Sequence, residues 1–247
     1  MKKILALMLA VLMVMACFVG CNGNDKNKLT IATSPDFPPF EYYDDNNNVI
    51  GIEIEILKLV CEELGYTLDI QTMNFDAVLT GVASNKYQLG VSGISVTPER
   101  QENMLFTNPY CLAAQAIVVK EGSAITSKTD LTGKKVSVQT GTTADEGCTE
   151  AGYNVQAFAA NADAKAALTT GKVDAWVVDN LTALQMVEEG DGLVVLNENM
   201  TDEPYAFAFA FGSEDLVAEI DKILAKLIAD GTVEEIFAQY GETYFKP

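Results

Sequence analysis

A single arginine lies where the chain has the features of an anion-binding turn. An apolar segment stops near Gly93, small hydroxyl residues follow, and a Thr-Pro-Glu opening at 97–99 leads into a short helix that carries Arg100. Backbone N–H groups near Ser95 can point out of such a turn, and a guanidinium binds a carboxylate through two parallel hydrogen bonds. We therefore predict that Ser95 and Arg100 bind the carboxylate of a small ligand. The alternative is that Thr97 only caps a helix and Arg100 forms a surface ion pair.

A second turn of this kind begins at Gln139. It contains Gly141, and it places the backbone N–H groups of Thr142 and Thr143 at the start of a helix, where an anion is favoured. The segment lacks the Gly-x4-Gly-Lys spacing of a nucleotide-binding loop, so phosphate chemistry is not expected. A capping box from Thr143 to Glu146 would be compatible with ligand contact.

Three further residues fit either a ligand-binding role or an ordinary structural role. A strand over 171–178 ends at Asp179, which either caps the following helix or faces a ligand. Phe37 and Phe75 either pack in a core or form the walls of a pocket. Two consecutive prolines follow Phe37 and hold its loop rigid, which suits a wall that presents one ring at a fixed angle.

The composition excludes several classes of function. The 247 residues are 49% hydrophobic, enough for one large core or two modest ones. With 35 acidic residues, 16 basic residues and no histidine, nucleic acid and anionic lipid surfaces are poor partners. We expect no standard metal site, no cofactor and no catalytic nucleophile. Cys61, Cys111 and Cys148 lie beside apolar residues and are expected to be buried.

The N-terminus has the pattern of an export signal. Two lysines precede an apolar run from Ile4 to Gly20, and a polar tether follows Cys21. The run is short for a membrane-spanning helix, which needs about 20 residues, and the whole pattern resembles a bacterial lipobox. We predict a signal peptide at 1–20 and a lipid-anchored tether at 21–28, with Cys21 as the lipidated residue. Cys17 is the competing site, and an uncleaved membrane anchor is the alternative.

Alternating strand and helix patterns predict α/β architecture with mixed sheets. Two long apolar strands, at 110–120 and 203–210, are predicted to cross between two lobes, so that the first lobe contains both ends of the chain. Ligands bind such folds at the carboxyl ends of strands, in the crevice between the lobes.

The motifs together resemble a known family. The sequence Gly-Ile-Ser-Val-Thr-Pro-Glu-Arg at 93–100, followed by Phe-Thr-Asn-Pro-Tyr at 106–110, is similar to the signature of the polar amino-acid-binding proteins of ABC importers, bacterial solute-binding protein family 3. Gly-Lys-Val-Asp-Ala at 171–175 with Asp179 resembles another motif of this family. The similarity extends from about Leu29 to the C-terminus.

The resemblance implies a fold and a division into lobes. Members have a two-lobed, periplasmic-binding-protein-like (Venus flytrap) fold, in which each lobe is a mixed sheet flanked by helices and two crossing strands act as the hinge. One lobe is expected at 29–113 and 204–247, and the other at 114–203.

The resemblance also implies how a zwitterionic ligand binds. The carboxylate contacts Arg100 with the N–H groups of Ser95 and Thr143, and the ammonium contacts Asp179 with the Gly93 carbonyl and Ser95. Because each lobe supplies part of each contact set, the ligand makes all of these contacts only when the cleft closes.

In the family, an aromatic residue matching Phe37 stacks on the ligand side chain, and Phe75 matches the opposite wall. Ser34 stands where many members have an aspartate, and Asp36 is a candidate substitute acid. The complete set of predicted ligand-binding residues is Ser34, Asp36, Phe37, Phe75, Gly93, Ser95, Arg100, Gln139, Thr142, Thr143 and Asp179.

The implied function is that of an extracytoplasmic, lipid-anchored and monomeric binding protein. It captures a free polar amino acid, with arginine or lysine favoured over glutamine, cystine or a similar ligand, and delivers it to the transmembrane subunits of an ABC permease. Two alternatives share the fold: a cyclohexadienyl or arogenate dehydratase, with Asp36 or Glu41 as the acid, and a ligand-sensing domain. No base accompanies either acid, so an enzyme is not predicted.

Overall fold

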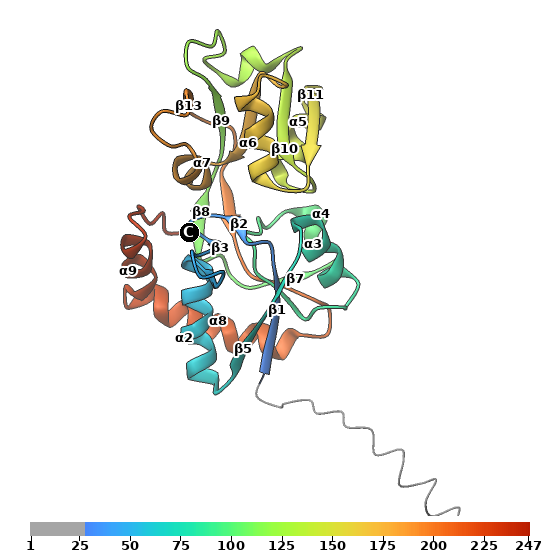
Figure 1. Ribbon diagram of the computed structural model, residues 1–247. Helices are drawn as coiled ribbons and strands as arrows, with labels where there is room; N and C mark the ends of the chain where they lie inside the picture. Colours follow the sequence, from blue (N-terminus) through green and yellow to red (C-terminus); the bar gives the residue numbers. More distant parts are fainter. Residues whose placement is uncertain (1–27) are drawn as a thin grey trace, which may run out of the picture.

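The computed structural model describes residues 28–247, and these form two lobes joined by a narrow waist (Figure 1). The predicted signal peptide at 1–20, Cys17 and Cys21 lie outside the described residues. Strands and helices alternate along most of the described chain, and each lobe contains a mixed sheet flanked by helices. The two-lobed α/β fold predicted from the sequence is therefore confirmed.

The first lobe is built on a five-stranded sheet. In spatial order its strands are β5 (Thr67–Thr72), β1 (Lys28–Thr33), β6 (Leu89–Gly90), β15 (Ala208–Phe209) and β7 (Leu105–Phe106). β1 lies parallel to β5 and β6, whereas β15 lies antiparallel to β6 and β7. Because β15 follows the second lobe in the sequence, this sheet joins segments from both ends of the chain.

The second lobe is built on another five-stranded mixed sheet. In spatial order its strands are β11 (Asn154–Phe158), β10 (Lys135–Gln139), β12 (Ala175–Asp179), β9 (Gln115–Lys120) and β13 (Leu193–Asn199). β10 lies parallel to β11 and β12, and β9 lies antiparallel to β12 and β13. Both strand-to-helix turns of the candidate site in this lobe therefore leave parallel strands at their carboxyl ends.

The waist is a two-stranded antiparallel ribbon of β8 (Cys111–Ala113) and β14 (Glu203–Tyr205). The continuous strands predicted at 110–120 and 203–210 are wrong in detail, because each is split into two short strands. The physical reason is a change of partner: β8 pairs with β14, but β9 pairs with β12 and β13, and β15 pairs with β6 and β7. A strand leaves one ladder of hydrogen bonds before it joins another.

A small third sheet surrounds the proline pair. It consists of β2 (Asp36–Phe37), β3 (Glu41–Tyr43) and β4 (Val49–Ile50). The prolines themselves lie between the strands, since a residue without an N–H group cannot donate to a ladder. The rigid turn presents the Phe37 ring toward the waist, where it packs near the Tyr205 ring.

Helices flank both sheets (Figure 1). Those of the first lobe are α2 (Ile52–Leu64), α3 (Phe75–Ala83), α4 (Pro98–Gln101), α8 (Glu214–Ala229) and α9 (Thr232–Gln239). Those of the second lobe are the 3-10 helix η2 (Lys128–Leu131) and the α-helices α5 (Thr143–Glu150), α6 (Asn161–Thr169) and α7 (Asn180–Met186). Across residues 28–247, no helix has both the length and the apolar character that crossing a membrane would require.

Each lobe has its own apolar core. In the first lobe, α2, α8 and α9 pack around a core of buried residues that reaches the sheet. In the second lobe, apolar clusters cover both faces of the sheet, and Trp176 of β12 is fully buried. Cys61, Cys111 and Cys148 are buried, which agrees with the prediction.

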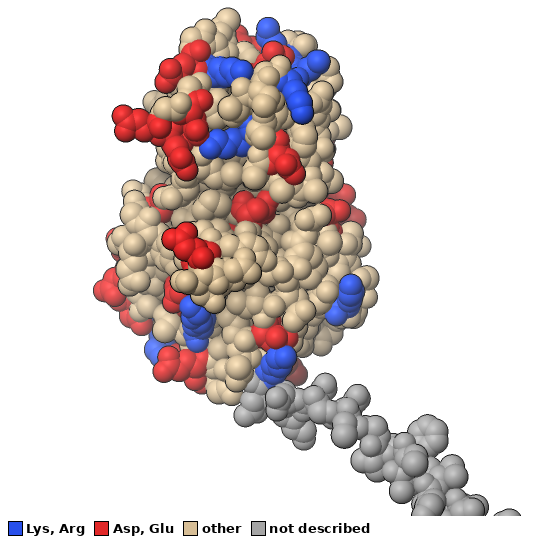
Figure 2. Space-filling view, in the orientation of Figure 1, with Lys and Arg blue, Asp and Glu red and all other residues tan. Residues whose placement is uncertain are grey.

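Acidic side chains dominate the charged surface. On the face drawn in Figure 2 they are spread over both lobes, and basic side chains are interspersed among them. This distribution agrees with the excess of 35 acidic over 16 basic residues in the sequence. A mixed, acidic surface of this kind favours solubility and offers little attraction for a polyanion.

Candidate ligand-binding site

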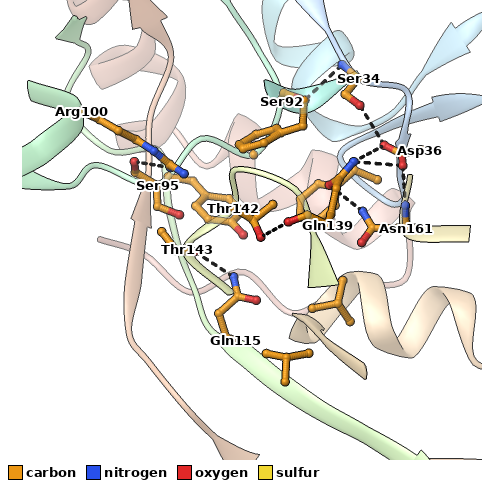
Figure 3. A pocket seen from close by; sticks show the side chains of 16 residues that line it. Ser34, Asp36, Ser92, Ser95, Arg100, Gln115, Gln139, Thr142, Thr143 and Asn161 are labelled. Atoms are coloured by element: carbon orange, nitrogen blue, oxygen red, sulfur yellow. Dashed lines mark hydrogen bonds between the residues drawn. The ribbon is translucent and has the colours of Figure 1, made fainter. Parts of the chain in front are cut away.

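One pocket lies between the two lobes, and both lobes contribute to its wall (Figure 3). Ten of the eleven predicted ligand-binding residues line it, and Asp179 does not. The lining also contains residues that the sequence analysis did not identify. The complete lining is Ser34, Asp36, Phe37, Phe75, Ser92, Gly93, Ser95, Arg100, Gln115, Gln139, Thr142, Thr143, Asn161, Val177, Val178 and Tyr205.

Arg100 lies at one side of the pocket, in the first turn of a helix capped by the Thr97 side chain (Figure 3). Its side chain is only 5% exposed. Nη1 donates to the Ser95 carbonyl at 3.0 Å and Nη2 to the Gly141 carbonyl at 3.1 Å, while the buried Nε has no partner among residues 28–247. The alternative of a surface ion pair is wrong, because the guanidinium is buried and every ion pair within residues 28–247 is formed by a lysine. A donor therefore remains available to a ligand carboxylate.

The charge of Arg100 is only partly compensated by its surroundings. Burial has the largest effect on the pKa of Arg100 and lowers it, whereas the charges of Glu146 and Glu203 act in the opposite direction. The guanidinium carbon lies 5.6 Å from the centre of the Phe75 ring, a distance at which a cation interacts with an aromatic face. A ligand carboxylate at Nε would further stabilise the charged form.

Opposite Arg100, the turn before α5 brings two threonines to the pocket. Thr142 is the N-cap residue, and its hydroxyl accepts from the Asp145 backbone N–H at 3.2 Å. The predicted capping box from Thr143 to Glu146 is therefore wrong by one residue, because the helix begins at Thr143 rather than after it. The displacement leaves the Thr143 hydroxyl free of a capping role, and it lies in the pocket wall instead.

Asp36 lies at the side of the pocket away from Arg100 (Figure 3). Its carboxylate accepts from the Ser34 hydroxyl at 3.0 Å, from Gln139 Nε2 at 3.1 Å and from the Asn161 backbone N–H at 2.8 Å. Burial raises the pKa of Asp36, and the hydrogen bonds partly offset this effect. Two of these donors belong to the second lobe, so Asp36 connects the lobes. The sequence analysis did not identify Asn161 as a site residue, because an asparagine at the start of a helix ordinarily serves only to cap that helix.

The Phe37 ring needs a glycine beside it. Gly93 has a φ of +52°, and a Cβ atom built on it would lie 2.4 Å from Cε1 of Phe37. A larger residue at this position would displace the ring, which stacks on Phe40 with the ring centres 5.4 Å apart. Phe75 is 5% exposed and belongs to a core cluster of the first lobe as well as to the pocket wall. Core packing and pocket lining are therefore compatible roles here.

Asp179 is buried behind the pocket rather than in its wall. Its Oδ1 accepts from the backbone N–H groups of Leu181 and Thr182, at 2.8 Å and 3.0 Å, so it caps α7. Its Oδ2 accepts from the Tyr205 hydroxyl at 2.9 Å, and Tyr205 does line the pocket. Burial raises the pKa of Asp179 to about 7. The structural role considered for this residue is thus present, and a direct ligand contact stays a prediction.

Two polar residues at the waist were not identified from the sequence. Gln115 lines the pocket at the start of β9, and its buried Oε1 has no hydrogen-bond partner in the described part of the chain. Glu203 lies in β14 and accepts hydrogen bonds from the side chains of Ser95, Thr143 and Gln115. The available signal was a single polar residue inside an apolar run at 110–120, and a pair of adjacent acids, Asp202 and Glu203, before another apolar run.

A pair of buried glutamates supports the floor of the pocket. Glu41 accepts from the Ser92 hydroxyl at 2.8 Å, and Glu53 accepts from the Gly93 backbone N–H at 3.0 Å. Both side chains are fully buried. Glu41, considered above as the acid of a dehydratase, is not among the lining residues. The glutamates hold the Ser92-Gly93 segment and do not face the space that a ligand would occupy.

The fold and the site define a class of protein: a two-lobed binding protein whose pocket lies between the lobes and presents a buried cation on one side and an acid on the other. The comparison with known families agrees. Residues 29–243 match the bacterial extracellular solute-binding proteins, family 3, and the chain belongs to this family. The family resemblance inferred from the motifs is therefore confirmed.

Individual relatives are similar over nearly their whole length. The arginine-binding extracellular protein ArtP of Bacillus subtilis (strain 168) is 30% identical over 248 residues, covering 96% of each chain. A crystal structure of a mutant of ArgBP from T. maritima is 33% identical, with a TM-score of 0.83, and the match covers 88% of this chain and 96% of that chain. An ancestral arginine-binding protein bound to glutamine is 35% identical, with a TM-score of 0.82, and the match covers 87% of this chain and 97% of that chain.

Proposed function

We propose that this chain is the extracytoplasmic substrate-binding component of an ABC importer and that it captures a polar amino acid between its two lobes. The observation that carries this proposal is the arrangement of opposite charges around one pocket, with buried Arg100 on one side and half-buried Asp36 on the other. A zwitterionic ligand with a long side chain has complementary groups at both ends.

Arginine or lysine is the favoured ligand. The hydrogen-bond donors recorded around Asp36 within residues 28–247 are all neutral, so no cation in direct contact balances its charge. A guanidinium or ammonium group at the end of a ligand side chain would supply that charge. The names of the relatives, in which arginine recurs, support the same choice. Glutamine follows, since a related protein has been solved with glutamine bound, and cystine or another polar amino acid remains the next choice.

The proposed mechanism is closure of the lobes around the ligand. We assign residues 29–113 and 204–247 to one lobe and 114–203 to the other, with the β8–β14 ribbon as the hinge. Arg100 and Ser95 belong to the first lobe, and Thr142 and Thr143 belong to the second. A ligand that contacts both sets binds the closed state more tightly than the open state, and this difference in affinity shifts the equilibrium toward closure.

A thermal-shift screen with the twenty standard amino acids tests the proposal. Ligand binding to the folded state stabilises it by RT ln(1 + [L]/Kd), about 2.7 kcal/mol at a concentration of 100 Kd. We expect L-arginine or L-lysine to raise the unfolding temperature most, with calorimetry giving Kd for the leading compounds. A screen in which no amino acid shifts the transition would overturn the proposal. Turnover of prephenate or arogenate by the same sample would instead indicate a dehydratase.

Membrane attachment through Cys21 is the second part of the proposal. Delivery to a permease requires the binding protein to stay at the outer face of the cell membrane, and a lipid on Cys21 would keep it there. We expect the anchored protein to be a monomer. Mass spectrometry of the membrane-bound form tests this: a mature chain that begins with lipid-modified Cys21 supports the assignment. A chain that begins at Met1, or a lipid on Cys17, contradicts it.

A further inference from the structure

Glu203 lies one layer behind the pocket, and we propose that it determines recognition of the ligand's α-ammonium group. Its carboxylate fixes which atoms of Ser95, Thr143 and Gln115 are turned toward the ligand. This inference rests on the proposed amino-acid-binding function and names a positioning residue within that site. The residue is 4% exposed and belongs to β14 of the waist.

Four hydrogen-bond donors converge on the Glu203 carboxylate. Oε2 accepts from the Ser95 hydroxyl at 2.5 Å, from the Thr143 hydroxyl at 2.7 Å and from Gln115 Nε2 at 3.3 Å. Oε1 accepts from the Thr201 hydroxyl at 2.8 Å. Ser95 belongs to the first lobe and Thr143 to the second, so one carboxylate orients hydroxyl groups from both sides of the pocket.

This arrangement gives the pocket wall a definite polarity. A hydroxyl group has one proton to donate and two lone pairs that accept. The protons of Ser95 and Thr143 are both directed at Glu203, so each hydroxyl can offer only lone pairs to the pocket. Such a wall accepts hydrogen bonds and cannot donate them, which suits an ammonium group and disfavours a second carboxylate.

Gln115 adds a third acceptor to the same wall. Its Nε2 donates to Thr143 at 3.2 Å and to Glu203 at 3.3 Å, which uses both amide protons and fixes the orientation of the side chain. In Figure 3 the amide nitrogen is turned toward Thr143 and the oxygen lies on the other side. That oxygen is buried, and none of the residues that the structure describes donates a hydrogen bond to it. A buried acceptor without a donor is costly, so a ligand N–H group is the natural partner.

The positions of Arg100 and Glu203 explain why both ends of an α-amino acid fit. Ser95 lies between the two charges, because its carbonyl accepts from Arg100 and its hydroxyl donates to Glu203. A ligand carboxylate at Arg100 therefore has its α-ammonium group beside the acceptor wall. Positive and negative charges then alternate in the order Arg100 guanidinium, ligand carboxylate, ligand ammonium and Glu203 carboxylate.

The test compares each amino acid with its desamino analogue. Calorimetry gives the ratio of Kd values for δ-guanidinovaleric acid and L-arginine, for ε-aminocaproic acid and L-lysine, and for glutaramic acid and L-glutamine. Glu203→Gln keeps the shape of the side chain, removes its charge and can donate hydrogen bonds. For this variant we expect the Kd of the desamino analogue divided by the Kd of the amino acid to fall at least tenfold. Glu198→Gln is the matched control and should leave the ratio unchanged. It makes the same change at a side chain whose only hydrogen bond within residues 28–247 is the one it accepts from the exposed Lys128 N–H.

The possible outcomes are distinct. Equal losses for both members of a pair in Glu203→Gln would indicate a purely structural role and overturn the inference. A wild-type ratio near one would also overturn it while leaving amino-acid binding intact. Wild-type protein that binds none of the three amino acids would refute the proposed function itself. If Glu203→Gln does not fold, the same Kd ratio is measured for Gln115→Met instead. That ratio must fall at least threefold, and an unchanged ratio overturns the inference.

Discussion

Nη2 of Arg100 lies 3.1 Å from the carbonyl oxygen of Gly141, and this hydrogen bond joins the two lobes across the pocket. Arg100 is positioned by α4 of the first lobe, and Gly141 lies in the turn before α5 of the second. The contact closes the pocket beside the group that is proposed to bind the ligand carboxylate. The same guanidinium therefore combines the proposed contact with the ligand and the observed contact between the lobes.

Replacing Arg100 with alanine is expected to abolish most ligand binding. The substitution leaves a desolvated ligand carboxylate unpaired, which costs roughly 3 to 5 kcal/mol, equivalent to about 10² to 10³-fold or more in Kd. Calorimetry with L-arginine measures the change. Lys86→Ala removes an exposed cation of the first lobe that stacks on Tyr87, and it should bind as the wild type does. A loss of less than tenfold in Arg100→Ala contradicts the assigned role.

Asp36→Asn tests the selection of side-chain charge. The amide retains an acceptor but loses the negative charge, so affinity for L-arginine should fall at least tenfold, while affinity for L-glutamine should change less than threefold. Asp45→Asn, at an exposed residue of the neighbouring turn, is the matched control and should change neither. Losses of similar size for both ligands would indicate that Asp36 acts by joining the lobes through Gln139 and Asn161, and not by selecting a cation.

Two substitutions at Asp179 separate capping from ligand recognition. Asp179→Ala leaves three donors without their acceptor, those of Leu181, Thr182 and Tyr205, and should lower the free energy of unfolding by about 1 to 3 kcal/mol. Asp179→Asn can still cap the helix, so it should fold normally and lose affinity for α-amino acids. Urea denaturation and calorimetry give the two quantities. A normally folded Asp179→Asn protein with wild-type affinity would leave capping as the only role.

The part of the site that the sequence predicted is the part encoded locally. The turn before Arg100 and the turn before Thr143 each contain, within a few residues, the glycine, the cap and the polar groups that form the pocket wall. Ten predicted residues reach the pocket because such turns follow strands that end at the cleft. The fold was predictable for the same reason, since alternating elements and two apolar crossings are visible in short windows of sequence.

The missed residues depend on contacts that no local pattern contains. Glu203 and its partner Ser95 are 108 positions apart, and Gln115 and Glu203 are 88 positions apart. An acid before an apolar strand resembles an ordinary residue at a strand end until the fold brings three donors from distant positions to it. The breaks in the two crossing strands were missed likewise, because a change of pairing partner is a property of the sheets and not of the strand sequence.

Glu41→Gln is expected to change how stability depends on pH. Glu41 and Glu53 are neighbouring acids, and both side chains are fully buried. Burial, followed by the charge of Glu53, raises the pKa of Glu41 well above its ordinary value, and burial also raises the pKa of Glu53. The folded state thus keeps a proton that the unfolded chain loses near pH ~4.3. The free energy of unfolding must then fall as pH rises above that value, by about 1.4 kcal/mol per pH unit for one proton.

A glutamine at position 41 can still accept from Ser92, but it does not titrate. The difference in unfolding free energy between Glu41→Gln and the wild type should therefore increase in favour of the variant as pH rises above about 5. Urea denaturation at several pH values measures it, with Glu62→Gln on the exposed face of α2 as the control. A difference that stays constant over this range, or that moves against the variant as pH rises, would mean that the pair holds no proton in the folded state.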